Sequence, residues 1–344
     1  MIQPDPLSTI DSPWLTAAEP VDETVTMPQT LAGVFDEAFD LYKRHFPLLA
    51  MIVAVGLIPT EILRNIVVAV WLHPLDAHLS GVSNGNPDSI VLLRLGQFFF
   101  GEPRSGFAGI LAFLVLVLLS APISIAVSDI YFGRDATVKD CYKRSRPYLM
   151  SMMWAYCQTF LVSVGVIFVG ILAASVIGGL IVGLFSLVRL PDIGGVIFLI
   201  LLIAVPYFSF QAVIARTFLF VTPLTVLEGL PASYVPYRNN QLVGKKRFGR
   251  SWAATSAIPV LWLGFLAILN YSVQGALDVI HLPSVAQFIA VSALGTAVHF
   301  FLAPYWTIFV TLLYYDYRVR REGFDVRVLS LANPEKAEEQ GAEG

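Results

Sequence analysis

Three acidic residues occupy the same kind of position in this sequence, directly after a long apolar run and before a basic segment. Asp129, Glu228 and Asp316 hold these positions, and Arg or Lys follows each within ten residues. Carboxylates there can pair with the neighbouring basic side chains and fix the depth of a helix in a membrane. Alternatively, three carboxylates lining one vestibule would bind a cation or the amine of a lipid head group. Both interpretations stay open.

Two further polar residues lie inside apolar runs. Arg216, in FQAVIARTFLFV, precedes Pro223 by seven residues, or about 10 Å along a helix. It either reaches the cytoplasmic membrane surface or meets Glu228 or Asp129. Alternatively, it contacts a phosphate or other anion in a cavity. His299, in GTAVHFFLAPYW, has no acid or second histidine at helical spacing. A hydrogen-bonded packing role is therefore favoured for His299 over a proton relay or a ligand contact.

Catalytic and cofactor motifs are missing from the sequence. It contains no HExxH, Walker loop, GxSxG or dinucleotide fingerprint, and these patterns carry the common hydrolytic and nucleotide chemistries. Two cysteines are too few for a zinc site of the usual spacing. We therefore expect no enzyme, no metal and no cofactor. The five histidines are too scattered for a shared metal site, at His45, His73, His78, His281 and His299.

The composition places the elements that carry these residues in a membrane. The 344 residues have a mean hydropathy of +0.70 and 14% charged residues, against roughly 25% charged in soluble domains. A crossing helix needs about 20 apolar residues, and lipid offers no partner for unpaired backbone groups. We predict an all-α protein with six transmembrane helices, near residues 46–72, 106–130, 148–187, 193–225, 251–275 and 285–315.

The basic residues predict the orientation of these helices. Seventeen Lys and Arg residues fall on one side of the six-helix arrangement and four on the other, and basic loops face the cytoplasm. Both termini are therefore expected in the cytoplasm. The basic residues expected to contact anionic head groups at that surface are Lys43, Arg44, Arg144, Arg146, Lys245, Lys246, Arg247, Arg318, Arg320 and Arg321.

The basic segments also resemble one another. LYKRHFPLLAM (41–51) and CYKRSRPYLMS (141–151) share an Arg-x-x-Pro spacing, and VGKKRFGRSWA (243–253) follows about a hundred residues later. We predict three repeats, each an interfacial helix followed by two transmembrane helices. The predicted membrane domain covers residues 29–328, with repeats at about 30–130, 131–228 and 229–328. Residues 1–28 and 329–344 are expected to be disordered cytoplasmic tails, and no cleaved signal peptide is expected.

Small residues in the third run predict a close helix contact. Gly179 and Gly183 in SVIGGLIVGLF are four residues apart, so they share one helix face and let another helix approach. Packing within the chain and dimerisation both fit this spacing.

Three stretches, TLAGVFDEAFDLYKRHFPLL, DIYFGRDATVKDCYKRS and LLYYDYRVRREGFD, resemble the glycerophosphoryl diester phosphodiesterase membrane-domain family and its uncharacterised bacterial relatives. The resemblance covers roughly residues 30–328 and implies the membrane region of that family, in a bacterial cytoplasmic (inner) membrane. Some members add a soluble phosphodiesterase domain. The residues after Arg327 are too few for such a domain, so that activity is not expected.

These features predict a non-enzymatic, multi-pass membrane protein that binds or handles lipid or an amphiphile. Its ligand would enter a cytoplasm-facing cavity near Arg216, Asp129, Glu228 and Asp316. Membrane lipids are the expected partners, and no nucleic acid is expected. One alternative is a scaffold or assembly module for partner proteins or further copies of itself, which would use the Gly179–Gly183 face and the basic segments. A small-solute transporter is a second alternative.

Overall fold

The computed structural model describes residues 30–67, 103–187, 191–280 and 284–322. All regular structure within these ranges is helical, with no β-strand among them. The all-α prediction is therefore confirmed for the part of the chain that is described.

Six long helices overlap the six predicted apolar runs. They are α2 (Phe46–Val67), α5 (Pro103–Tyr131), α7 (Leu149–Leu187), α8 (Pro191–Val213), α10 (Val235–Ile280) and α11 (Ser284–Glu322). Shorter elements link them, namely α1 (Leu31–Arg44), α6 (Val138–Ser145), the 3₁₀-helix η3 (Arg146–Tyr148), the π-helix η4 (Ile214–Phe218) and α9 (Val221–Val226).

Two helical stretches are long and apolar enough to cross a membrane. They are Val138–Leu187, which runs from α6 into α7, and Gly194–Val226, which runs from α8 into α9. Only 17% and 11% of their most apolar windows are buried within the protein, so these aliphatic surfaces need a non-aqueous environment. Helices α1 and α2, which meet at 82°, supply a third candidate if the bent pair is one span. The described residues thus support a membrane protein with two or three such helices.

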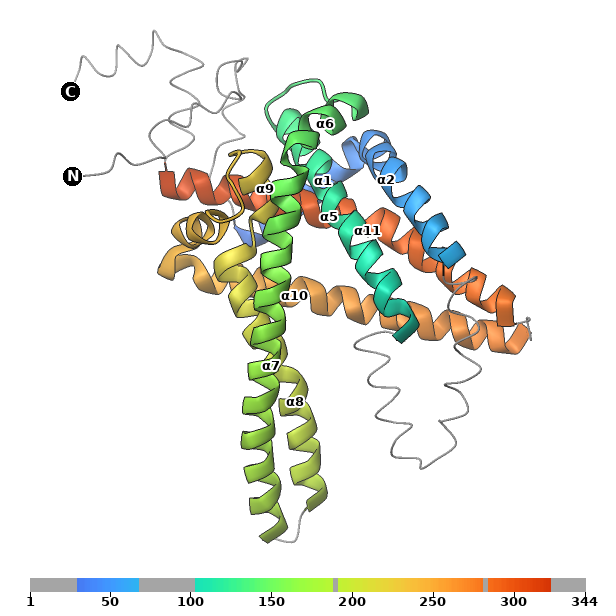
Figure 1. Cartoon of the computed structure of the whole chain (residues 1–344), viewed down its shortest axis with the longest axis vertical. Coiled ribbons are helices and arrows are strands. Elements are labelled where there is room, and N and C mark those ends of the chain that lie inside the picture. The colour runs from blue at the N-terminus through green and yellow to red at the C-terminus, as the bar shows by residue number, and fades with distance from the viewer. Residues whose placement is uncertain (1–29, 68–102, 188–190, 281–283, 323–344) are drawn as a thin grey trace, which may run out of the picture.

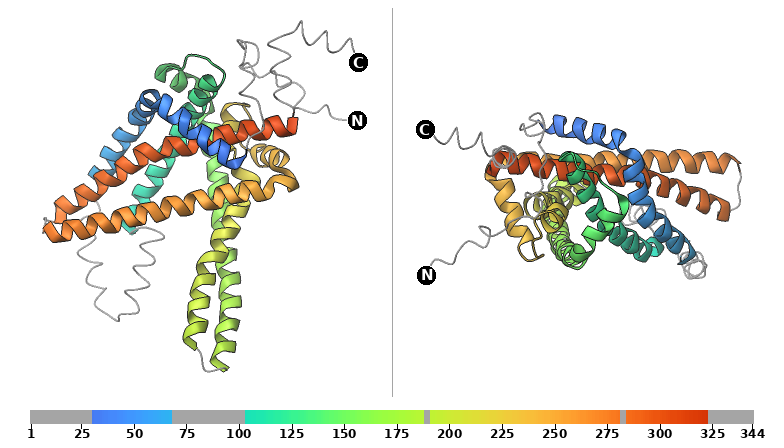
Figure 2. Two further views of the ribbon diagram at one scale, coloured as in Figure 1. Left: turned by 180° about the vertical axis from the view of Figure 1, so that it is seen from behind. Right: turned by 90° about the horizontal axis from the view of Figure 1, so that it is seen from above.

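The long helices form three pairs that diverge from one region (Figures 1 and 2). Helices α2 and α5 pack together, as do α10 and α11, and these two pairs extend towards the same side in Figure 1. The α7–α8 hairpin projects away from both pairs. The helix junction, as we call the region where the pairs meet, contains α1, α6 and α9, the C-terminal ends of α5 and α11, and the first turns of α10.

The short helix α1 shows how the sequence builds the junction. The Thr30 hydroxyl accepts a hydrogen bond from the Gly33 backbone N–H at 3.0 Å and caps the helix. Buried residues recur every three or four positions, at Val34, Ala38 and Leu41, and form one apolar face. That face packs on α11, where the rings of Phe35 and Phe309 stack at 4.3 Å.

Comparable contacts anchor the other two segments predicted to lie at the membrane surface. Helix α6 packs on α5, and its Tyr142 hydroxyl donates to the Ile52 carbonyl of α2 at 2.7 Å. The first turns of α10 pack on η4 and α9, where the Asn239 side-chain oxygen accepts from the Phe220 N–H at 2.8 Å. A positive φ of 56° at Gly244 then kinks α10 and separates these turns from the long part of the helix.

The α7–α8 hairpin packs through different glycines from those expected. A Cβ on Gly170 would lie 2.7 Å from the Pro206 Cα, and one on Gly178 would meet the Phe198 ring. No described atom lies within 4 Å of the corresponding positions on Gly179 and Gly183. Among the described residues, none packs against the Gly179–Gly183 face, and packing of this face within the chain stays a prediction. Dimerisation through the same face likewise stays a prediction.

Candidate functional site

The C-terminal part of α11 connects several elements of the junction. Tyr314 and Tyr317 are 0% exposed and Tyr315 is 4% exposed, so these tyrosines are core residues and not side chains at a membrane surface. Their hydroxyls reach three elements, with Tyr314 donating to Glu228 at 2.7 Å, Tyr315 donating to Ser128 at 2.8 Å and Tyr317 bonding to Ser251 at 2.7 Å. These three neighbouring tyrosines therefore join α11 to the segment after α9, to the end of α5 and to α10 just beyond its kink.

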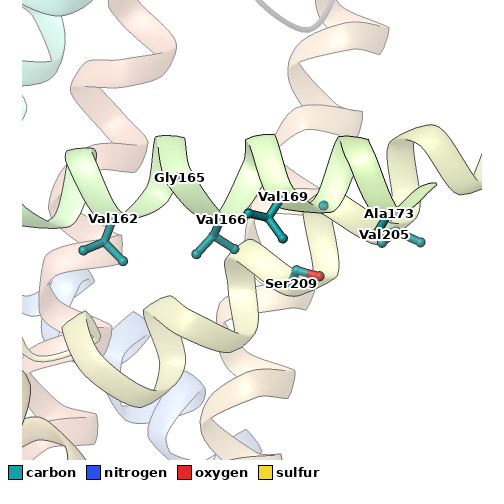
Figure 3. Close-up of a pocket in the computed structure, with 8 residues that line it drawn as sticks. Val162, Gly165, Val166, Val169, Ala173, Val205 and Ser209 are labelled. Atoms are coloured by element: carbon teal, nitrogen blue, oxygen red, sulfur yellow. The ribbon is translucent and has the colours of Figure 1, made fainter. Parts of the chain in front are cut away.

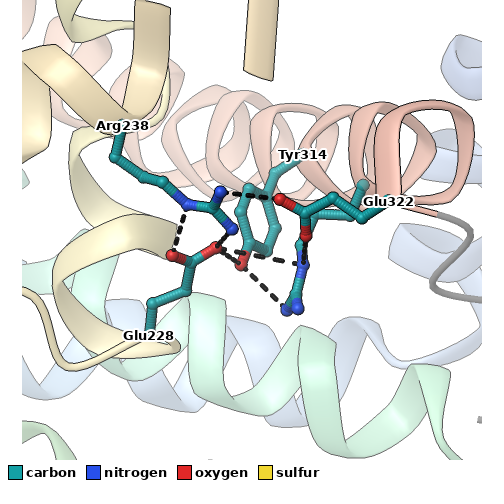
Figure 4. Close-up of polar contacts among 5 residues, drawn as sticks. Glu228, Arg238, Tyr314 and Glu322 are labelled. Atoms are coloured by element: carbon teal, nitrogen blue, oxygen red, sulfur yellow. Dashed lines mark hydrogen bonds and ion pairs between the residues drawn. The ribbon is translucent and has the colours of Figure 1, made fainter. Parts of the chain in front are cut away.

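A polar network surrounds Glu228 (Figure 4). Arg238 on α10 donates from Nε to Glu228 at 2.8 Å and forms a 2.6 Å ion pair with Glu322 on α11. Arg318 bonds Glu322 at 3.1 Å and donates to the Tyr314 hydroxyl at 3.2 Å. Since the side chains of Glu228 and Arg238 are only 6% and 13% exposed, this network is shielded from water and joins α9, α10 and α11.

Charge and burial oppose one another at Glu322. Burial alone would raise the pKa of its carboxyl, but the hydrogen bond and charge of Arg238, with Arg318, lower that pKa below the ordinary value of 4.5. Burial opposes the charge of Arg238, but the hydrogen bonds and charges of Glu228 and Glu322 raise its pKa. Both groups are therefore held in their charged forms.

The other two predicted acids are ion-paired as well. Asp129, at the end of α5, accepts a hydrogen bond from Arg144 on α6. Asp316 accepts from Arg320 Nε at 3.0 Å and pairs with Arg250 at 3.0 Å. The pairing interpretation thus describes the geometry at all three acids, and each acid has its own arginine partners. A ligand role for the acids stays a prediction.

Arg216 lies on the π-helical turn η4 and is exposed. Its Nε donates to the Asn240 side chain at 3.2 Å, and among the described ion pairs none joins it to Glu228 or Asp129. A π turn inserts an extra residue and re-aims the side chains after it, which spacing in the sequence does not reveal. His299 lies in α11, but its side chain falls outside the described residues.

The predicted basic surface divides into two groups. One group is exposed, namely Lys43, Arg44, Arg146, Lys245, Lys246 and Arg321. The other group is partly buried and bonded within the junction, namely Arg144, Arg247, Arg318 and Arg320. Only the first group presents its charge directly to the surroundings.

An open groove of about 450 Å³ runs between α7 and α8 (Figure 3). Its walls are carbon except at Ser209, and it is lined by Val162, Gly165, Val166, Val169, Gly170, Ala173, Val205 and Ser209. None of the predicted ligand-binding residues lines this groove. The small residues on α7 were the signal for it, because glycine and alanine leave room between paired helices.

Comparison with protein-family models, curated proteins and solved structures gives no match to this chain. The resemblance to the phosphodiesterase membrane-domain family therefore stays a prediction.

Proposed function

We propose that this chain is a non-enzymatic, multi-pass membrane protein that binds membrane lipid in the α7–α8 groove. The groove carries the proposal because it opens on a hairpin whose outer surface is aliphatic. Leu172, Val176 and Leu180, for example, are 52–66% exposed, and burying such a side chain away from water gains about 1.5–3 kcal/mol. Lipid chains are the solvent that such a surface requires.

An acyl chain fits the lining of the groove. The walls supply valine, glycine and alanine, with one hydroxyl at Ser209, and they offer no charge to a polar solute. The helix continues from Ser209 through the end of α8 into the π turn η4, which carries Arg216. Arg216 then lies about 10 Å beyond Ser209.

Arg216 supplies the head-group contact in this proposal. Its guanidinium is exposed and is oriented by Asn240, and guanidinium geometry matches phosphate. The bound molecule would thus be an anionic phospholipid with one chain in the groove and its phosphate at Arg216. Because Asp129, Glu228 and Asp316 are paired with arginines, the contact is placed at Arg216 and not at these acids.

The same proposal includes six crossings in three repeats with cytoplasmic termini. Its support is a shared contact pattern, in which α1 packs on α11, α6 on α5, and the first turns of α10 on η4 and α9. Each short segment thus rests on the returning helix of the preceding unit, with α1 closing the cycle. The exposed basic residues of the junction favour the cytoplasmic side for it.

Native mass spectrometry of protein released from nanodiscs tests the lipid site. Gly165→Leu adds an aliphatic side chain at a residue that lines the groove and whose Cβ position has no described atom within 4 Å, and Gly179→Leu is the matched control outside the groove. We expect the wild type and Gly179→Leu to retain an anionic phospholipid. Gly165→Leu and Arg216→Gln should lose most of it, and equal retention in all four proteins would contradict the proposal.

A scaffold or assembly role is the second candidate, and the open Gly179–Gly183 face favours it. Leu180 and Leu184 flank this face and are 66% and 62% exposed, which suits a helix of a partner or of a second copy. Sedimentation in detergent should then show an oligomer that Gly183→Leu dissociates while lipid retention is unchanged. A monomer in both proteins would leave this face without a role in self-assembly.

A further inference from the structure

Four arginines lie where the kink of α10 meets the end of α11, and two of them bond the same carboxylate. Arg247 and Arg250 come from α10, and Arg320 and Arg321 from α11. Arg250 and Arg320 both bond Asp316 at 3.0 Å, and Arg247 donates to the Arg320 carbonyl at 2.8 Å. Within the part of the chain that is described, this arginine cluster carries four positive charges and bonds one carboxylate, that of Asp316.

Arg250 has hydrogen-bonding capacity that the cluster does not use. Its Nη1 pairs with Asp316, but its Nε and Nη2 are buried and have no hydrogen-bond partner among the described residues. Only 19% of the side chain is exposed. A buried guanidinium N–H without an acceptor is costly, so an acceptor supplied from outside the chain would stabilise this arrangement.

The neighbouring arginines show the same excess of positive charge. The pKa of Arg247 is lowered, first by burial and then by the charges of Arg320 and Arg321. Arg321 lies against the kink, because a Cβ on Gly244 would come within 3.2 Å of its Nη1. Exposed Lys245 and Lys246 follow the kink directly. An anion bound here would relieve repulsion that Asp316 leaves unbalanced.

We propose that this arginine cluster is a phosphate-binding site. Arg250 would donate from Nε and Nη2, a pair of parallel N–H groups that fits two phosphate oxygens, while Arg247 and Arg321 supply further charge. A phosphate dianion suits the cluster better than a carboxylate, since it carries more charge and more acceptor oxygens. The phosphate belongs either to a lipid head group or to a soluble phosphate, and the chemistry of recognition is shared. The site does not depend on the α7–α8 groove or on Arg216.

The test compares thermal unfolding of the full chain in nanodiscs of zwitterionic phosphatidylcholine, with and without inorganic phosphate, at constant ionic strength. A second set of nanodiscs contains phosphatidic acid. Arg321→Gln removes an exposed charge of the cluster, and Arg146→Gln removes an exposed arginine elsewhere in the junction. Arg250→Lys keeps the charge that pairs with Asp316 but removes the parallel N–H pair.

We expect phosphate to raise the Tm of the wild type and of Arg146→Gln, and Arg250→Lys and Arg321→Gln to weaken this response at least several-fold. A rise in Tm with inorganic phosphate would show that a soluble phosphate is enough to occupy the site. A rise in Tm with phosphatidic acid alone would show that the site binds a lipid head group. No response to either, or a wild-type response in both cluster variants, would overturn the proposal. Arg216→Gln should respond to phosphate as the wild type does. Loss of the groove lipid in that variant therefore tests the groove proposal alone and leaves the phosphate-site proposal unaffected.

Discussion

Arg238 bridges two carboxylates that lie 94 residues apart in the sequence, Glu228 two residues after α9 and Glu322 at the end of α11. Such a bridge is favourable only while every charge in it has its partner, because removing one partner leaves an uncompensated buried charge. The protonation state of Glu322 is therefore tied to the contact between α10 and α11.

Acidification should loosen this bridge. The folded-state pKa of Glu322 lies below its ordinary 4.5, so its contribution to stability is complete above about pH 4.5 and is lost as the pH falls through the folded pKa. The Tm of thermal unfolding should therefore fall less steeply between about pH 6 and pH 3 for Glu322→Gln than for the wild type. Asp40→Asn is the control, because the Asp40–Lys43 pair is exposed and contributes little. Parallel pH profiles for wild type and Glu322→Gln would contradict this expectation.

At the residue scale, the sequence predicted where the three acidic residues lie better than it predicted their ion-pair partners. The spacing of Asp129, Glu228 and Asp316 after apolar runs identified three acids that the structure places in ion pairs. It did not identify Arg250 as a partner of Asp316, because that contact joins residues 66 positions apart on two helices. Tertiary packing alone brings such residues together.

The pairing of α7 with α8 depends on small residues at defined positions. Gly170→Ala would bring a methyl group to about 2.7 Å from the Pro206 Cα, where backbone has to shift. We expect it to lower the free energy of unfolding by about 1–3 kcal/mol. Gly179→Ala, which meets nothing within 4 Å, should be neutral or stabilising by up to about 1 kcal/mol through helix propensity. Unfolding followed by circular dichroism in detergent measures both, and similar values for the two variants would contradict this packing.

The helices were predictable from apolar length, but the face that each helix buries was not. Gly179–Gly183 and the buried series Gly170, Ala174 and Gly178 have the same four-residue spacing. Which series packs depends on where Pro206 and Phe198 of α8 lie opposite. The π turn at Arg216 was also not predictable from the local sequence. It packs on α10 and α8, so its conformation depends on tertiary contacts.

For the whole molecule, the three-pair arrangement makes a prediction about sidedness. The α7 end distant from the junction should face away from the cytoplasm, and the junction should face it. Single cysteines replacing Leu187 and Lys246, both exposed, test this in a background where Cys141 and Cys157 are serine. In intact spheroplasts a membrane-impermeant maleimide should label position 187 and leave position 246 unlabelled until the cells are lysed. Labelling of both, or of position 246 alone, would reverse or remove the proposed topology.

The docking of α1 on α11 sets the order in which the molecule can be completed during synthesis. Tyr42 donates to the Phe301 carbonyl across 259 residues, and Phe35 stacks on Phe309. The ribosome therefore releases the first helix long before its binding surface exists, whereas α6 meets α5 almost at once. A chain halted before α11 would keep the apolar face of α1 uncovered, which is the kind of surface that chaperones and proteases of quality control recognise. Among the described helices, α11 is thus made last and covers α1, which is made first.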